Sequence, residues 1–183
     1  MRTLSMLLLA TFVVAVVPAA GDVDAPVVAE HELKAEYVWR FTLFVDWPLK
    51  VMVSGSESLF AIGVVGASPV QDLLKARTDG RSIRGRPVVV REIANLDEIE
   101  GCHMLFIANS SPYELDEILA RTAGKPILTI SESNGYAERG VLINLFIADD
   151  RVRFEINQAA VRRSGLVFRS KLYKVARLIG GEE

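Results

Sequence analysis

The sequence predicts an α/β fold, a layered sandwich in which a central, mostly parallel sheet is flanked by helices. Three observations indicate it. Continuous apolar runs such as 59–66 fit strands that are buried on both faces, as in a parallel sheet. Such runs alternate with helical segments over 59–130, which is the pattern of right-handed βαβ units. The strictly alternating segment 151–157 follows a turn and predicts one antiparallel hairpin near the C-terminus.

The first twenty residues have the layout of a secretory signal peptide. Arg2 supplies a positive charge, an uncharged apolar run of 14 residues follows over 4–17, and Pro18 leads into small residues. The run is shorter than the roughly 20 residues that a membrane-spanning helix needs, although an uncleaved membrane anchor is the alternative. We expect residues 1–20 to be a signal peptide, 21–29 a linker and 30–180 a single domain.

The first helix of that domain is expected over 30–47. Leu33, Tyr37 and Phe41 recur at a spacing of four residues, which is typical of an amphipathic helix. Pro48 should end the helix. The many large apolar side chains predict that this helix packs against the sheet.

The middle of the chain alternates strands with capped helices. The expected strands are 59–66, 86–91, 103–108 and 126–130. The expected helices are 70–78, which Ser68 caps, and a segment that opens at Ser110 and runs through Arg121.

The C-terminal part begins with the hairpin, whose expected strands are 140–148 and 151–157. Asn144 and Glu155 are polar residues within these apolar strands, and buried polar groups need partners. We expect the two side chains to meet across the hairpin.

Two helices are expected after the hairpin. Asn157 caps the first, which runs to Ser164 and stops at Gly165. Ser170 caps the second, whose apolar stripe reaches Ile179.

Composition excludes several classes of protein. The chain is 50% hydrophobic and 24% charged, with a net charge of −2, so it is neither disordered nor equipped with the basic face that nucleic acid requires. A single cysteine excludes an internal disulfide. Because Cys102 leads directly into an apolar run, we expect a buried core thiol; a reactive thiol, the alternative, would need an exposed electropositive site.

Catalytic and metal-binding motifs are missing from the sequence. The only histidines are His31 and His103, whereas a zinc site needs three or four ligands at characteristic spacing. Neither a nucleophile elbow nor a glycine-rich phosphate loop occurs. We therefore expect no enzyme activity, no metal and no cofactor.

Polar side chains gather where the predicted strands end, which is the usual place for ligands in open α/β sheets. The candidate ligand-binding residues at these ends are Ser68, Ser110, Ser111 and Ser131, and Arg139, in the link between the fourth strand and the hairpin, is a further candidate. The alternative for the serines is plain helix capping, and Arg139 could pair with Glu138 instead.

Other residues are candidates for contact with a protein partner. They are Trp39, Arg40 and Trp47 in the first helix, and Arg169 and Lys171 in the basic C-terminal segment. Aromatic and arginine residues are the usual anchors of interfaces. The alternatives are core packing for either tryptophan and a solvated face for the basic segment.

Over about residues 30–180 the chain resembles the YfiR-like family of periplasmic proteins. The resemblance rests on EHELKAEYVWRFTLFVDWP at 30–48, GRPVVVRE at 85–92, GCHMLFIA at 101–108 and, above all, the long ordered stretch at 126–179. It implies an exported α/β protein that is not an enzyme. It also implies inhibition of a membrane-bound diguanylate cyclase through the periplasmic sensor region of that enzyme, sequestration by an outer-membrane lipoprotein, and self-association.

We therefore expect a periplasmic regulatory binding protein that acts in cyclic di-GMP and biofilm signalling. Some relatives carry cysteine pairs, but this chain has only Cys102, so redox control through an internal disulfide is excluded. The alternative function is a periplasmic sensor that binds a small solute at the strand-end serines.

Overall fold

The computed structural model describes residues 25–53 and 59–181, so the predicted signal peptide lies outside the described residues. The elements, in chain order, are α1 (Ala25–Phe41), β1 (Val45–Asp46), α2 (Leu49–Val53), β2 (Phe60–Val65), α3 (Pro69–Thr78), β3 (Ser82–Ile83), β4 (Arg86–Glu92), the 3₁₀ helix η1 (Leu96–Gly101), β5 (Met104–Ile107), α4 (Leu115–Thr122), β6 (Leu128–Ser131), β7 (Ile143–Ala148), β8 (Arg151–Asn157), α5 (Gln158–Ser164), β9 (Val167–Phe168), α6 (Ser170–Tyr173) and β10 (Arg177–Ile179).

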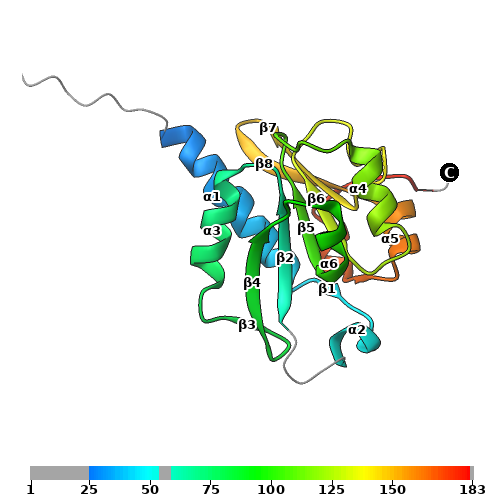
Figure 1. The fold of residues 1–183 in the computed structure, drawn as a ribbon. Coiled ribbons are helices and arrows are strands. Elements are labelled where there is room, and N and C mark those ends of the chain that lie inside the picture. The colour runs from blue at the N-terminus through cyan, green and yellow to red at the C-terminus, as the bar shows by residue number, and fades with distance from the viewer. Residues whose placement is uncertain (1–24, 54–58, 182–183) are drawn as a thin grey trace, which may run out of the picture.

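Most of these strands form one sheet in the order β10-β8-β7-β6-β5-β2-β4-β3, and β1 pairs with β9 in a separate small sheet (Figure 1). Within this sheet the adjacent strands β4, β2, β5, β6 and β7 run parallel to one another, and β10 is parallel to β8. β7 and β8 form the predicted antiparallel hairpin, and β3 adds an antiparallel edge. The predicted α/β sandwich with a mostly parallel sheet is confirmed.

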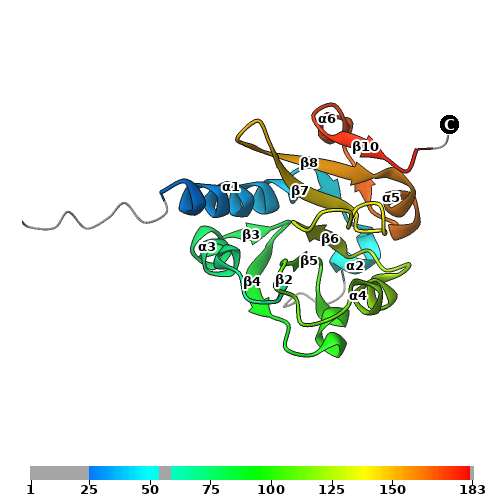
Figure 2. The ribbon, with the colours of Figure 1, turned by 90° about the horizontal axis from the view of Figure 1, so that it is seen from above.

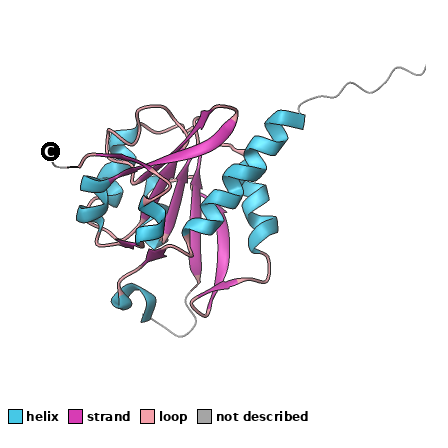
Figure 3. Ribbon diagram, turned by 180° about the vertical axis from the view of Figure 1, so that it is seen from behind, coloured by secondary structure: helices cyan, strands magenta, loops and turns pink. Residues whose placement is uncertain are grey.

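A hydrophobic layer lies on each face of the sheet. In β5, Met104 and Phe106 belong to the core beneath α1 and α3, whereas Leu105 and Ile107 face the core beneath α4. This alternation is the period-two pattern of a strand buried on both sides. Figure 2 shows α1 and α3 on one side of the sheet and α4 on the other, and Figure 3 shows α1 and α3 crossing the same face.

Cys102 occupies the core beneath α4, as predicted for a buried thiol. It is a free cysteine, and its burial raises the pKa of the thiol, so the group stays protonated and unreactive. Gly63 of β2 leaves room for it, because a Cβ at that position would lie 2.8 Å from the Cys102 sulfur. The thiol therefore fills the space above a glycine in the central strand.

The first helix differs from its prediction at both ends. α1 begins at Ala25, inside the predicted linker, and it ends at Phe41 rather than at Trp47. After Phe41 the chain turns and pairs Val45 with Phe168 of β9. The apolar spacing continues through this turn, because these residues still face the core, and so local periodicity misplaced the end of the helix.

The structure differs from the predicted elements at three further places. α4 begins at Leu115 rather than at Ser110, and the carboxylate of Glu117 accepts a hydrogen bond from the backbone N–H of Glu114 at 3.2 Å. The short helix α2 was not predicted. The last predicted helix is a four-residue turn, α6, followed by β10, which pairs Leu178 with Ile156 of β8. The apolar residues that suggested a helical stripe up to Ile179 therefore belong in part to a short strand, and Val175, which precedes that strand, is exposed.

A cluster of rings closes the lower end of the sheet, where β2 and β5 begin. The indole N–H of Trp47 donates to the backbone oxygen of His103 at 3.1 Å, and the imidazole of His103 stacks on Phe60 with ring centroids 4.7 Å apart. The Nδ1 atom of His103 accepts from the backbone N–H of Ala61 at 3.2 Å. Burial, together with the nearby charge of Arg86, lowers the pKa of His103 to about 4.

Replacing His103 with Gln should flatten the pH dependence of stability between about pH 4 and 6.5. The folded chain keeps the imidazole neutral down to about pH 4, whereas an unfolded chain takes up the proton near pH 6.5. The unfolded state therefore binds more protons in this window, and the wild-type free energy of unfolding should rise by about 1–2 kcal/mol as the pH rises through it, a value reduced for the partial exposure of the ring. Urea unfolding across the window measures the slope, and a variant that keeps the wild-type slope would contradict this assignment.

Candidate functional site

The predicted ligand serines meet at one edge of the sheet, where parallel strands β2, β5 and β6 end. The loop after β2 touches the loop after β5, because the hydroxyl of Ser110 donates to the backbone oxygen of Ala67 at 2.6 Å. Gly66 has a φ of +86°, and a Cβ there would lie 2.8 Å from the backbone nitrogen of Ser111. A glycine is therefore needed for these two loops to lie against each other.

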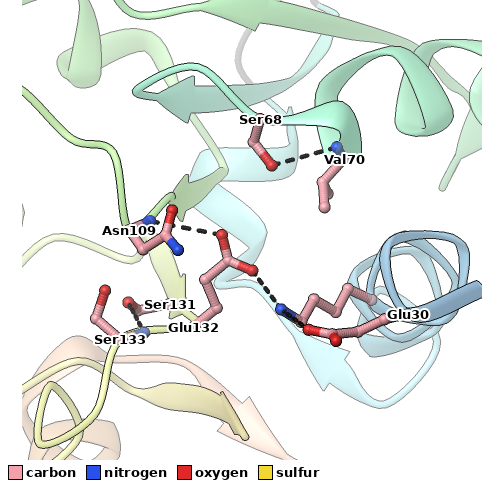
Figure 4. A network of polar contacts seen from close by, with 8 residues as sticks. Glu30, Ser68, Val70, Asn109, Ser131, Glu132 and Ser133 are labelled. Atoms are coloured by element: carbon pink, nitrogen blue, oxygen red, sulfur yellow. Dashed lines mark hydrogen bonds and ion pairs between the residues drawn. The ribbon is translucent and has the colours of Figure 1, made fainter. Parts of the chain in front are cut away.

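Each of the remaining serine hydroxyls at this edge bonds within its own loop. Ser68 accepts from the N–H of Val70 and caps α3, and Ser131 accepts from the N–H of Ser133, both at 3.2 Å (Figure 4). Ser111 accepts from the N–H of Tyr113, also at 3.2 Å. These bonds are those of caps and turns. A ligand role for the four serines stays a prediction.

The sequence reasoning missed the strongest interaction at this edge, an ion pair between Lys34 of α1 and Glu132. The ammonium nitrogen lies 2.6 Å from a Glu132 oxygen and 2.6 Å from a Glu30 oxygen, and the side chains of Lys34 and Glu132 are 9% and 5% exposed. The second Glu132 oxygen accepts from the backbone N–H of Asn109 at 3.5 Å, so Glu132 reaches from the end of β6 toward both the β5 loop and α1 (Figure 4).

A signal for this pair was present in the sequence. Lys34 lies on the same helical face as Val38 and Phe41, both of which are buried. A charged residue within an apolar stripe needs a buried partner of opposite charge. Burial alone would lower the pKa of Lys34, but its hydrogen bonds to Glu132 and Glu30 outweigh burial and raise the pKa. The lysine is therefore charged at neutral pH, and it holds α1 against the strand ends.

Arg139 lies away from the strand-end serines and lines a cavity of about 320 Å³ between α4 and α5. Its guanidinium pairs with Asp116 at 3.0 Å rather than with Glu138, and it sits 5.6 Å from the ring centre of Tyr136. The chain between β6 and β7 carries Arg139 onto the α4 face, and a ligand role for this residue stays a prediction.

Two of the predicted partner residues come together on a separate surface, which we call the Trp39 surface. It consists of Trp39, Leu43, Asp46, Arg84 and Arg169, and these residues line a hollow of about 420 Å³. Leu43 is 54% exposed although it is large and apolar. The surface joins the end of α1 to β1 and to residues that follow β3 and β9.

Ion pairs hold the Trp39 surface together. Two nitrogens of Arg169 donate to Asp46 at 3.1 and 3.2 Å, and Arg84 also pairs with Asp46. The hydrogen bond from Arg169 is the main cause that lowers the pKa of Asp46, so the carboxylate stays ionised well into the acid range. The guanidinium of Arg81 lies 5.4 Å from the ring centre of Trp39, a cation–π contact.

The other predicted partner residues fall elsewhere. Trp47 is only 3% exposed and belongs to the ring cluster around His103, so its prediction as an exposed contact residue of the first helix is wrong. Arg40 is exposed at the end of α1 and pairs with Glu36. Lys171 is exposed on α6. Sequence periodicity could not separate the two tryptophans, because both continue the apolar stripe.

Across 25–53 and 59–181, no group of three or more His, Cys, Asp or Glu side chains is placed to hold a metal ion. No helix in these two ranges is long and apolar enough to cross a bilayer.

The buried polar pair predicted in the hairpin is present, with the amide nitrogen of Asn144 donating to Glu155 at 3.2 Å. Arg177 of β10 also pairs with Glu155, so the buried carboxylate of Glu155 has polar partners on both β7 and β10.

Replacing Glu132 with Gln should destabilise the protein by about 2–3 kcal/mol, because it leaves Lys34 charged and buried with Glu30 as its remaining partner. A matched control is Asp72→Asn, which removes the exposed partner of Lys75 and should cost less than about 0.5 kcal/mol. Urea unfolding of both variants at neutral pH makes the comparison. Equal losses in the two variants would mean that Glu132 does not anchor α1.

Two solved structures are similar to this chain. A conserved domain protein from Vibrio cholerae O1 biovar El Tor has a similar structure, with a TM-score of 0.52 at 13% identity over 81% of this chain. This chain spans 59% of the length of that protein. The ABC domain in complex with L-Trp from Streptococcus pneumoniae gives a TM-score of 0.45 at 12% identity, over 81% of this chain and 62% of the other.

A family model matches most of the sequence. The match covers residues 31–177, from the first turns of α1 to the start of β10, and its description is YfiR/HmsC-like. It therefore includes the strand-end serines, the Lys34–Glu132 pair and the Trp39 surface, and it indicates no enzyme family. By this match over well more than half of its length, the chain belongs to the YfiR/HmsC-like family.

Proposed function

We propose that this protein is an exported periplasmic regulator that binds the periplasmic sensor region of a membrane-bound diguanylate cyclase and inhibits the enzyme. The observation that carries the proposal is membership of the YfiR/HmsC-like family over residues 31–177. The signal-like N-terminus, with Arg2 before the apolar run 4–17, supports export. An outer-membrane lipoprotein that bound the same protein would compete with the cyclase and release it.

We assign the docking of the cyclase to the Trp39 surface. An aromatic ring, arginines and an exposed leucine are the residue types that anchor interfaces. Arg84 and Arg169 both pair with the single carboxylate of Asp46, and Arg81 lies over the ring of Trp39, so this surface carries more positive than negative charge. It would suit a partner segment that presents an apolar side chain beside carboxylates.

Inhibition requires that the protein bind one state of the cyclase better than the other. A binder shifts a two-state equilibrium only by its difference in affinity for the two states. A shift from almost fully active to almost fully inactive needs a preference of about 10⁴-fold. Contacts on either side of the Trp39 surface support such a preference, since Lys34 holds α1 near its middle and β1 pairs with β9 just after the helix ends.

Replacing Leu43 with Asp should weaken binding to the cyclase periplasmic region by about tenfold or more, because it puts an extra carboxylate into the apolar part of the Trp39 surface. The matched control is Ile147→Asp in the hairpin. The side chain of Ile147 is similar in size to that of Leu43, and the two are 48% and 54% exposed. Binding of each purified variant to the isolated periplasmic region, measured by calorimetry, gives the two affinities.

In cells, deleting the gene should raise cyclic di-GMP, and the Leu43→Asp variant should fail to restore the low level while Ile147→Asp restores it. Unchanged cyclic di-GMP in the deletion strain, with no membrane signalling protein recovered on the purified domain, would overturn the cyclase proposal. If Ile147→Asp abolished binding and Leu43→Asp did not, the cyclase assignment would stand and the docking surface would move to the hairpin.

A second candidate function is a periplasmic sensor that binds a small solute. The observation that favours it is the meeting of Ser68, Ser110, Ser111 and Ser131 at the carboxyl ends of parallel strands. A solute at 100 times its dissociation constant should raise the free energy of unfolding by about 2.7 kcal/mol, which a thermal-shift screen detects.

Self-association into a homodimer is compatible with either function, and sedimentation of the purified protein measures it.

A further inference from the structure

The cavity between α4 and α5 has the chemistry of a binding site that neither proposed function uses. Three cationic side chains reach its rim from three different segments: Lys125 from the loop after α4, Arg139 from the loop before β7, and Arg163 from α5. The residues that line the cavity are all described, and none of them is acidic. Both helices lie on the same side of the molecule (Figure 1), and residues of both line the cavity.

The positive charge of this rim is incompletely neutralised. Lys125 pairs with Glu100 at 3.1 Å and Arg139 pairs with Asp116 at 3.0 Å, but the two carboxylates are 79% and 82% exposed and lie outside the cavity lining. Pairs as exposed as these contribute about 0–1 kcal/mol, so an incoming anion can share or replace them. Arg163 makes no ion pair within 25–53 and 59–181.

The wall of the cavity beneath the cations is apolar. It is made by Leu119, Ile127, Leu142 and Ala160, of which the last three are nearly fully buried. The hydroxyls of Thr122 and Ser164 also line the cavity, but both donate to backbone oxygens one turn earlier in their own helices. The volume of about 320 Å³ lies at the small end of the range for ligand pockets.

We propose that this cavity binds a small amphipathic organic anion, one that carries a single carboxylate or sulfonate on a compact apolar body. The acidic group would lie among Lys125, Arg139 and Arg163, and the apolar body would cover Leu119 and Leu142. An inorganic anion would meet the cations alone and would leave the apolar wall in water, so it should bind more weakly. The proposal is independent of the cyclase assignment, because the Trp39 surface shares no residue with this cavity.

The experiment uses two fluorescent probes with the same ring system, anilinonaphthalene sulfonate and the uncharged phenylnaphthylamine. The purified protein should bind the sulfonate and enhance its fluorescence, and Arg163→Gln should raise the dissociation constant about five- to tenfold. The matched control is Arg153→Gln, an exposed arginine beside the separate apolar hollow between α1 and the hairpin, and this change should have no effect. The uncharged probe should bind equally to all three proteins.

Two further readouts locate the site and define the ligand class. Octanoate should displace the sulfonate probe, whereas inorganic phosphate at the same concentration should not. In amide NMR spectra, octanoate should shift the signals of Gly124 and Gly140, which line the cavity. If the sulfonate binds Arg163→Gln as tightly as the wild type, or if Arg153→Gln carries the loss, the proposal fails and the cations serve only the C-terminus of α4.

Discussion

The buried ion pair between Lys34 and Glu132 is the contact on which the rest of the architecture depends. It joins the first helix to the end of β6, and through Glu132 it also reaches the loop after β5. Two buried charges stabilise a fold only when their geometry and further hydrogen bonds offset the cost of desolvation. Here Glu30 and the Asn109 N–H supply those further contacts, so the pair sets the position of α1 instead of weakening the core.

The C-terminal end of α1 is held by different means. β1 pairs with β9, more than a hundred residues away in the sequence, and Arg169 places two hydrogen bonds on Asp46 beside that pairing. Trp39 and Leu43 lie between the two anchors. A surface that lies between two such anchors is preorganised, and preorganisation reduces the entropy lost on binding. The fold thus fixes the half-buried ring of Trp39 and the exposed side chain of Leu43 in one defined surface.

Local patterns predicted the sheet well, because each strand carries its own evidence. The apolar run at 60–65 and the alternation at 151–157 require no knowledge of distant residues. Local patterns failed where a distant partner decides the structure. Residues 45–46 and 177–179 continue helical stripes in the sequence, yet β9 and β8 draw them into strands.

The candidate sites divide in the same way. The strand-end serines could be predicted to meet, since parallel strands end at the same edge of a sheet. The grouping of Arg139 with Lys125 and Arg163 could not, because it depends on how the loop before β7 crosses the α4 face. Likewise, the sequence around the two tryptophans is similar, so it could not predict that Trp47 lies in the core and that Trp39 is half-buried at the surface.

We propose that a signalling partner docks on the Trp39 surface. Hydrogen exchange of the protein, alone and bound to the periplasmic region of the cyclase, tests it most directly. We expect slower exchange on binding in the segment from Trp39 to Phe44 and near Arg84 and Arg169, with the hairpin turn at Asp149 unchanged. Protection confined to the hairpin or to the α4–α5 side, with the Trp39 segment exchanging as in the free protein, would contradict it.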